Sequence, residues 1–132
     1  MNYKIRESDN YGSGHFGARR GGRIHRGVDI VAQAGAPWKS LNSGKVTKLG
    51  FAYSDDLSYR YIEVTDEHGH KFRYFYVKAL PTLEVGHAVA SGDIIGHVQS
   101  LQKRYPGITE HVHFEVKDAR ESYFNPLPFL EA

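Results

Sequence analysis

Apolar and polar residues alternate along several short stretches of this chain, and the three-to-four-residue spacing typical of helices is scarce. Alternation with a period of two predicts strands that bury one face, because successive side chains of a strand point to opposite sides. Turn residues such as glycine and proline separate the stretches. The pattern therefore predicts an all-β fold. The expected strands are residues 24–31, 44–50, 59–65, 71–77, 94–98 and 111–117.

The clearest local signature is a β-hairpin. Residues 59–65 and 71–77 are rich in aromatic and β-branched side chains, and they flank the polar, glycine-containing turn at residues 66–70. Two such runs around a short turn are typical of paired antiparallel strands. Residues 100–105 are compatible with one helical turn. We find no internal repeat and no low-complexity segment.

The last predicted strand carries two histidines on one side. In an extended segment, His111 and His113 point to the same face, whereas Val112, Phe114 and Val116 point to the other, toward a core. A buried strand can therefore hold two imidazoles side by side along one wall of a site.

The first predicted strand offers a matching set. Within residues 24–31, the residues His25, Gly27 and Asp29 share one face, and the opposite face is largely apolar. Together the two strands could supply His, Asp and His to one metal, with one histidine left for chemistry. A His-x-His pair by itself is more often incidental, so the pattern alone leaves an inert β domain as an alternative.

Composition narrows the candidate chemistry. The chain has 132 residues, and we expect a single domain over 1–132, with an N-terminal extension at 1–11 and a C-terminal tail at 118–132. The chain has no cysteine, which excludes disulfides and thiolate ligands, so a metal would be held by His, Asp or Glu. A net charge of +2 does not indicate nucleic-acid binding.

The sequence shows no targeting or membrane signal. The N-terminal residues lack the apolar core of a secretory signal peptide, and no stretch approaches the roughly 20 apolar residues of a membrane span. Localisation stays open, and action outside the producing cell would need another route of release or delivery. Nothing in the sequence sets the oligomeric state, and we expect a monomer.

Zinc is the metal that a His, Asp and His set favours. It accepts imidazole nitrogen and carboxylate oxygen, and three protein ligands leave a fourth position for water. An open zinc site lowers the pKa of that water toward neutrality and polarises a substrate carbonyl. The candidate residues therefore point to hydrolytic chemistry as well as to metal binding.

Four motifs make the chain resemble the lysostaphin/LytM-type zinc metallopeptidases. The resemblance runs from about residue 12 to about residue 126, and the motifs occur in the order and at separations that fit that family. The motifs are Gly14-His15-Phe16-Gly17-Ala18-Arg19-Arg20, His25-Arg26-Gly27-Val28-Asp29, Val85-Gly86 with Gly92-Asp93-Ile94-Ile95-Gly96, and His111-Val112-His113-Phe114-Glu115. The resemblance implies a compact antiparallel β-sheet domain with a zinc-containing groove, in which a metal-activated water cleaves the peptide cross-links of bacterial peptidoglycan.

The resemblance also assigns roles to residues. It implies that His25, Asp29 and His113 bind zinc and that His111 is a catalytic histidine beside the metal. The implied partners are peptidoglycan peptides, and the implied site of action is the bacterial cell wall after release or delivery. The glycine-rich loop at residues 12–22 could overhang the groove, so His15 and Arg20 are candidate substrate-binding residues.

One position departs from the family pattern. Active members usually show Tyr-x-His after the hairpin, and here Tyr76 stands where that second catalytic histidine is expected. A tyrosine hydroxyl can donate a hydrogen bond to a developing oxyanion. It is a poor base near neutral pH, because its ordinary pKa is about 10. Tyr76 is thus a candidate catalytic residue, and a core aromatic residue is the alternative.

The segment at 101–113 resembles a subgroup that includes the vertebrate leukocyte cell-derived chemotaxin. That signalling protein has a tyrosine at the same place and is regarded as binding zinc without peptidase activity. The alternative function is therefore a catalytically inactive zinc-binding pseudopeptidase that acts as a binding or signalling module.

Other polar residues have more ordinary expectations. Glu115 shares the face of His111 and His113, and it could orient an imidazole through a hydrogen bond. The remaining histidines are expected in turns or at the surface without a metal. They are His68, His70, His87 and His97.

Overall fold

The computed structural model describes residues 3–9, 11–20 and 23–130, and this part of the chain is almost entirely β-structure. The prediction of an all-β fold is confirmed. The elements are β1 (Arg19–Arg20), β2 (Arg23–Ile24), β3 (Val28–Val31), β4 (Pro37–Lys39), β5 (Gly44–Phe51), β6 (Arg60–Thr65), β7 (Lys71–Phe75), β8 (Val77–Ala79), β9 (Ala88–Val89), β10 (Ile94–Val98), β11 (His111–Lys117), β12 (Tyr123–Phe124) and α1 (Leu127–Leu130).

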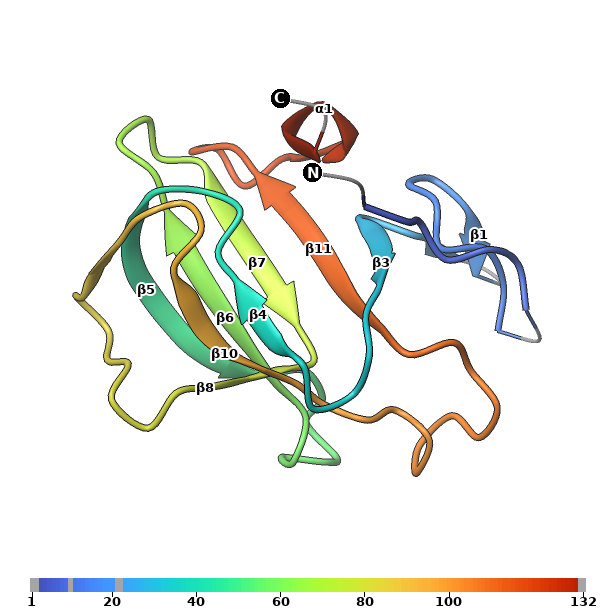
Figure 1. Ribbon diagram of the computed structural model, residues 1–132. Coiled ribbons are helices and arrows are strands. Elements are labelled where there is room, and N and C mark those ends of the chain that lie inside the picture. The colour runs from blue at the N-terminus through green and yellow to red at the C-terminus, as the bar shows by residue number, and fades with distance from the viewer. Residues whose placement is uncertain (1–2, 10, 21–22, 131–132) are drawn as a thin grey trace.

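The main sheet is antiparallel, and its strands neighbour one another in the order β12-β11-β7-β6-β5-β9 (Figure 1). β7 pairs with one edge of β11, while β3 and β12 follow one another along the other edge. This register places Asp29 of β3 directly opposite His113 of β11. Two of the predicted ligands are therefore brought together by strand pairing.

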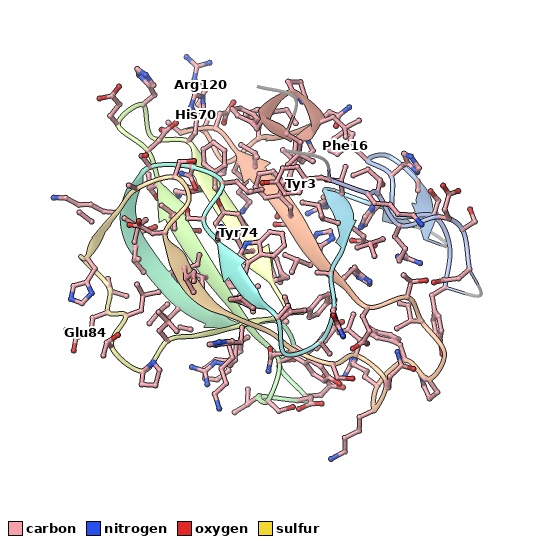
Figure 2. The ribbon with its side chains drawn as sticks, viewed as in Figure 1. Tyr3, Phe16, His70, Tyr74, Glu84 and Arg120 are labelled. Atoms are coloured by element: carbon pink, nitrogen blue, oxygen red, sulfur yellow. The ribbon has the colours of Figure 1, made fainter. Side chains whose placement is uncertain are left out.

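A smaller sheet, in the order β4-β10-β8, covers one face of the main sheet (Figure 1). Between the two sheets lies the core, in which Tyr74 is fully buried and visible at the centre of Figure 2. The Tyr74 ring stacks on Phe114 of β11, with ring centroids 5.4 Å apart. Val112 and Val116 join this core as predicted, so His111 and His113 point away from it.

The predicted hairpin forms, but its second strand is shorter than expected. β6 and β7 pair around the turn at residues 66–70, whereas the expected strand 71–77 breaks at Tyr76. Tyr76 has a φ of 70°, in the left-handed region that side chains other than glycine seldom adopt. Its backbone N–H donates to the carbonyl of Arg60, and its carbonyl accepts from Gln99, so the neighbouring chain holds this conformation.

The break changes the direction of the Tyr76 side chain. In a continuous strand, Tyr76 would point into the core like Tyr74, because side chains alternate. Instead Phe75 and Tyr76 both line the groove on the histidine face, and Val77 returns to the core. The left-handed backbone conformation of Tyr76 therefore directs its side chain into the groove.

The first ligand-bearing segment also differs from the prediction. The expected strand 24–31 is divided, since β2 ends at Ile24 and β3 begins only at Val28. The described part of the N-terminal extension lies along the edge of β3 that faces away from β11, where Ile5 bridges Ile30 and the carbonyl of Lys4 accepts from the N–H of Val31.

The prediction of one helical turn at residues 100–105 matches a hydrogen bond from the Tyr105 N–H to the carbonyl of Leu101. No helix among the described residues is long and apolar enough to cross a membrane.

Candidate metal centre

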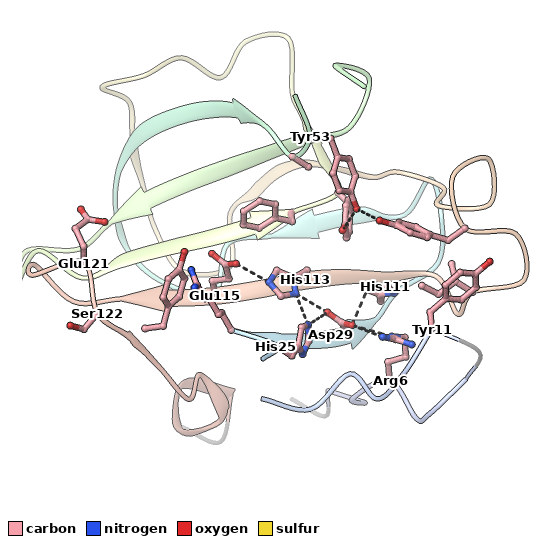
Figure 3. A pocket seen from close by; sticks show the side chains of 17 residues that line it. Arg6, Tyr11, His25, Asp29, Tyr53, His111, His113, Glu115, Glu121 and Ser122 are labelled. Carbon is pink, nitrogen blue, oxygen red and sulfur yellow. Dashed lines mark hydrogen bonds and ion pairs between the residues drawn. The ribbon is translucent and has the colours of Figure 1, made fainter. Parts of the chain in front are cut away.

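Three side chains converge on the open face of β11. The Oδ1 atom of Asp29 lies 3.0 Å from Nε2 of His25 and 2.8 Å from Nδ1 of His113. The two nitrogens are 2.9 Å apart (Figure 3). One atom from each predicted ligand therefore meets at a single point, and the three residues form a group that could hold a metal ion.

His25 reaches this point from outside a strand. Its backbone N–H donates to the carbonyl of Ala18, and its carbonyl accepts from the N–H of Gly17. The loop before the ligand segment therefore fixes its position, rather than the strand geometry that we expected. Gly27 then lets the chain pass close to β11, since a Cβ atom there would lie 2.3 Å from the carbonyl oxygen of Phe114.

Each imidazole has one nitrogen held by a hydrogen-bond acceptor. Nδ1 of His25 donates to the carbonyl of His15 at 2.9 Å, and Nε2 of His113 donates to Oε1 of Glu115 at 3.0 Å. A histidine that binds a metal usually donates its other N–H in this way, which fixes the tautomer and orients the ring. The remaining nitrogens, Nε2 of His25 and Nδ1 of His113, are the two that face Asp29.

His111 is held in the same manner but stands to one side. Its Nδ1 donates to the carbonyl of Thr109 at 2.6 Å, and its Nε2 lies 3.5 Å from Oδ2 of Asp29. Burial lowers the pKa of His111, against the opposing charge of Asp29. The Nε2 atom is thus a lone-pair donor at neutral pH, next to the metal group and outside it.

The charges of the metal-free group are tightly coupled. Burial alone would raise the pKa of Asp29, but hydrogen bonds from His113 and His25 outweigh it and hold that pKa well below its usual range. Burial alone would lower the pKa of His113, but its hydrogen bonds to Asp29 and Glu115 raise it to about 9. The carboxylate is therefore ionised and ready to accept a cation.

The arrangement fits zinc. Ligand atoms around a tetrahedral zinc ion lie about 3.3 Å apart, given bonds of about 2.0–2.2 Å. The three candidate atoms are 2.8–3.0 Å apart, so a small outward movement of the side chains would suffice. Two nitrogens and one carboxylate oxygen are also a donor set that zinc accepts. His25, Asp29 and His113 would hold the ion.

A groove of about 1200 Å³ runs past this group (Figure 3). Glu121 and Ser122 lie at one end and Tyr11 at the other. The lining residues are Arg6, Tyr11, His25, Arg26, Asp29, Ala52, Tyr53, Phe75, Tyr76, Tyr105, Ile108, His111, His113, Glu115, Glu121, Ser122 and Tyr123. An extended chain could thus pass across the metal group.

Tyr76 belongs to a tyrosine cluster beside His111. Its ring meets the His111 ring edge to face, with centroids 5.7 Å apart. Its hydroxyl lies 2.7 Å from the hydroxyl of Tyr53, which lies 2.7 Å from that of Tyr105. Burial raises the pKa of the Tyr76 hydroxyl, so this group stays protonated at physiological pH.

The structure describes the side chain of only one of the two candidate substrate-binding residues, His15. His15 is exposed and its imidazole interacts with Ser13, while its backbone carbonyl holds His25; the side chain is not among those that line the groove. The side chain of Arg20 lies outside the described part of the structure. Glu115 contacts His113 as the shared face predicted.

Sequence reasoning missed three residues of the site. Arg6 contacts Asp29 from the N-terminal segment, and Tyr53 and Tyr105 contact the Tyr76 hydroxyl directly or through one another. Arg6 and Tyr53 lie in no recognisable motif and are far from the candidate ligands in sequence, and Tyr105 lies in the 101–113 segment without a chemical pattern that marks it as a site residue. Only the fold could place them.

Comparison with known proteins supports this description. Residues 23–126 match the sequence model of Peptidase family M23. Leukocyte cell-derived chemotaxin-2 from Mus musculus is 30% identical over 118 residues, which cover 89% of this chain and 76% of that protein.

Two solved structures of lysostaphin show the same fold. The antimicrobial peptidase lysostaphin from Staphylococcus simulans matches with a TM-score of 0.73 at 26% identity, over 98% of this chain and 53% of the other. Its catalytic domain matches with a TM-score of 0.68 at 28% identity, over 99% of this chain and 94% of the other. The chain thus spans about half of the longer lysostaphin structure and corresponds to its catalytic domain.

Proposed function

Because the chain belongs to peptidase family M23, we propose that it is a zinc-dependent endopeptidase that cleaves peptide cross-links of bacterial peptidoglycan. The observation that carries the proposal is the orientation of three imidazoles. Each has one nitrogen held by an acceptor, and the other faces the carboxylate of Asp29. Two of these nitrogens would complete a zinc site with Asp29, and the third would be available for proton transfer.

The metal would contribute the electrophilic chemistry. Zinc held by His25, Asp29 and His113 would lower the pKa of a water and polarise the scissile carbonyl. The groove supplies room for a peptide across this point. The other contributions come from side chains of the chain itself.

His111 is proposed as the base. Its Nε2 atom carries the free lone pair, since Nδ1 donates to Thr109, and its lowered pKa keeps that lone pair available at neutral pH. A positioned base of this kind contributes about 10²–10⁴-fold to the rate. His111 would take the proton of the attacking water and pass it to the leaving amine.

Tyr76 is proposed to stabilise the oxyanion. Nε of Arg104 donates to the hydroxyl of Tyr105 at 3.3 Å, and an arginine side chain can only donate. The hydroxyl of Tyr105 can then donate a hydrogen bond to the hydroxyl of Tyr53, and Tyr53 can donate to Tyr76. This order leaves the proton of Tyr76 directed into the groove, where a hydrogen bond to developing negative charge acts in catalysis.

A second candidate function is favoured by the same tyrosine. The hydroxyl of Tyr76 is engaged by Tyr53, and its raised pKa prevents it from acting as a base. If the missing histidine is an essential base, the chain is an inactive zinc-binding pseudopeptidase with a binding or signalling role. Its similarity to chemotaxin-2 is consistent with that alternative.

The deciding experiment measures new amino groups released from purified peptidoglycan by the zinc-loaded protein. The endopeptidase proposal predicts release that is lost in His113→Ala, which removes a ligand while leaving the groove. A Tyr76→His variant separates the two functions. If Tyr76 is an adapted residue, this variant is no faster than the wild type; if it is a lesion, activity rises strongly. Absence of release from several wall types, with one zinc bound per chain, would favour the pseudopeptidase.

A further inference from the structure

Among the side chains that the structure describes, Arg6 is the most deeply buried charged one outside the candidate ligands and His111. Only 2% of its surface is exposed, although it lies in a segment that precedes the region matched by the family model. A buried guanidinium is costly unless its donors are paired. The partners of Arg6 therefore show what this segment contributes to the molecule.

The guanidinium holds one oxygen of a metal-ligand candidate. Nε and Nη2 of Arg6 each lie 3.0 Å from Oδ2 of Asp29 (Figure 3). On its other side, Nη1 donates to Oδ1 of Asp9 at 2.7 Å and to the carbonyl of Gly12 at 2.8 Å. The arginine is thus fixed between the N-terminal segment and the carboxylate of Asp29.

The main chain aims the guanidinium at this position. The N–H of Arg6 donates to the carbonyl of Asp29, and the carbonyl of Arg6 accepts from Gly14, whose own carbonyl accepts from the N–H of Asp29. A Cβ atom on Gly14 would lie 2.6 Å from Cβ of Arg6 and 2.9 Å from Cβ of Asp29. The three residues therefore pack without room for another side chain.

The two oxygens of Asp29 consequently have separate tasks. Oδ1 faces His25 and His113, while Oδ2 is occupied by Arg6. A carboxylate without such a partner can rotate and offer either one or both oxygens to a metal. We propose that Arg6 is a positioning residue of the metal centre, which fixes Asp29 as a ligand through Oδ1 alone.

The inference rests on the metal site of the proposed function and not on catalysis. Groups that hold a metal ligand typically change metal affinity by about 10- to 100-fold when they are mutated. Arg6→Lys keeps the charge but loses the paired donors, and Arg6→Gln loses the charge as well. We expect both variants to bind zinc about 10- to 100-fold more weakly in competition with a chromophoric chelator.

Glu63→Gln is the matched control. Glu63 is buried on β6 and accepts from Nε of Arg73 at 2.6 Å and from Oγ1 of Thr47 at 2.8 Å, and neither partner is a candidate ligand. Glu63→Gln also breaks a buried charged pair. Thermal melts of the metal-free proteins should therefore show destabilisation in Glu63→Gln as well as in the Arg6 variants. Only the Arg6 variants should lose zinc affinity.

Cobalt(II) provides a spectroscopic readout that a general loss of stability would not change. A carboxylate that turns to offer both oxygens raises the coordination number, which weakens the visible absorption of tetrahedral cobalt. We expect weaker absorption in cobalt-loaded Arg6→Lys than in the wild type and in Glu63→Gln. Should Arg6→Lys fail to fold, Asp9→Asn removes one anchor of Arg6 and should weaken zinc binding to a smaller extent.

Unchanged zinc affinity and an unchanged cobalt spectrum in the Arg6 variants would overturn the inference. So would equal losses of zinc affinity in Arg6→Lys and Glu63→Gln, since the effect would then be general. A wild-type protein that binds zinc but cleaves no peptidoglycan would contradict the proposed function and leave the role of Arg6 intact.

Discussion

At the scale of single residues, the hydrogen bonds behind the site decide what it can do. The acceptors that orient His25, His111 and His113 are two backbone carbonyls and one carboxylate. They leave each free nitrogen facing Asp29. A hydrogen bond also orients Tyr76, since its hydroxyl contacts that of Tyr53, which is distant from it in sequence.

Tyr53→Phe tests whether this alignment matters for catalysis. The change removes the hydroxyl that joins Tyr105 to Tyr76 and leaves every proposed catalytic side chain in place. A donor to the oxyanion is worth about 10²–10³-fold in kcat, so misaligning it without removing it should cost about a tenth of that factor, roughly 10- to 100-fold. Steady-state kinetics on a defined peptide should show the loss in kcat with KM nearly unchanged.

Tyr74→Phe is the control for Tyr53→Phe. Tyr74 is fully buried, and its hydroxyl donates to Oδ1 of Asn42 and accepts from the N–H of Leu41, far from the groove. Its loss should lower stability by about 1 kcal/mol and leave kcat unchanged. Equal kcat values in the two variants would argue against a role for Tyr53.

At the scale of elements, the site depends on how closely β3 approaches β11. The pairing places Asp29 opposite His113, and the chain before β3 must pass the carbonyl of Phe114 to bring His25 alongside. Gly27 permits this passage because it has no Cβ. The glycine of the His-x-Gly-x-Asp motif is therefore explained by packing between two ligand-bearing segments.

Gly27→Ala should separate the ligands. The added Cβ would lie 2.3 Å from a backbone oxygen, which cannot yield as a flexible side chain can. Overpacking of this kind costs about 1–3 kcal/mol, and here the strain falls between His25 and His113. We expect weaker zinc binding as well as a lower urea midpoint, measured by chelator competition and equilibrium unfolding.

Gly35→Ala distinguishes this effect from ordinary backbone strain. Gly35 has a φ of +84°, and a Cβ there would meet no atom within 4 Å. The substitution should lower stability by about 1 kcal/mol through its conformation alone and leave zinc affinity intact. If Gly27→Ala also binds zinc normally, the close approach is not needed for the site.

At the scale of the whole molecule, the stability of the metal-free protein should depend on pH through two of the candidate metal ligands, His113 and Asp29. The pKa of His113 is about 9 when folded, against an ordinary value of 6.5, so its stabilising contribution is complete below about pH 6.5 and is lost as pH rises through about 9. Asp29 acts in the opposite sense. Its lowered pKa gives stability that is present above about pH 4 and is lost as pH falls.

Zinc binding should therefore release a proton at neutral pH. His113 must give up the proton on Nδ1 before that atom can bind a metal. Calorimetry in two buffers of different ionisation enthalpy should detect about one proton per zinc from His113 at pH 7, in addition to any released by a zinc-bound water, and the contribution of His113 should disappear above about pH 10. Release of no proton at pH 7 would show that His113 is already neutral in the metal-free protein.

Local pattern predicted most strands but not their interruptions. Alternation in 111–117 and the turn at 66–70 depend on neighbouring residues, and both were confirmed. The breaks at 25–27 and at Tyr76 depend on hydrogen bonds with Ala18, Arg60 and Gln99, which are distant or lie outside the strand pattern. A period of two cannot show where the rest of the fold overrides it.

The sequence by itself determined the all-β class, the core face of β11 and the set of metal-binding candidates, because these follow from side-chain alternation and residue chemistry. The tertiary structure decided which atoms face one another. It brought Arg6 to Asp29, turned Tyr76 into the groove and assigned one nitrogen of each imidazole to an acceptor. These are contacts between segments distant in the chain, and their geometry exists only once the sheet has formed.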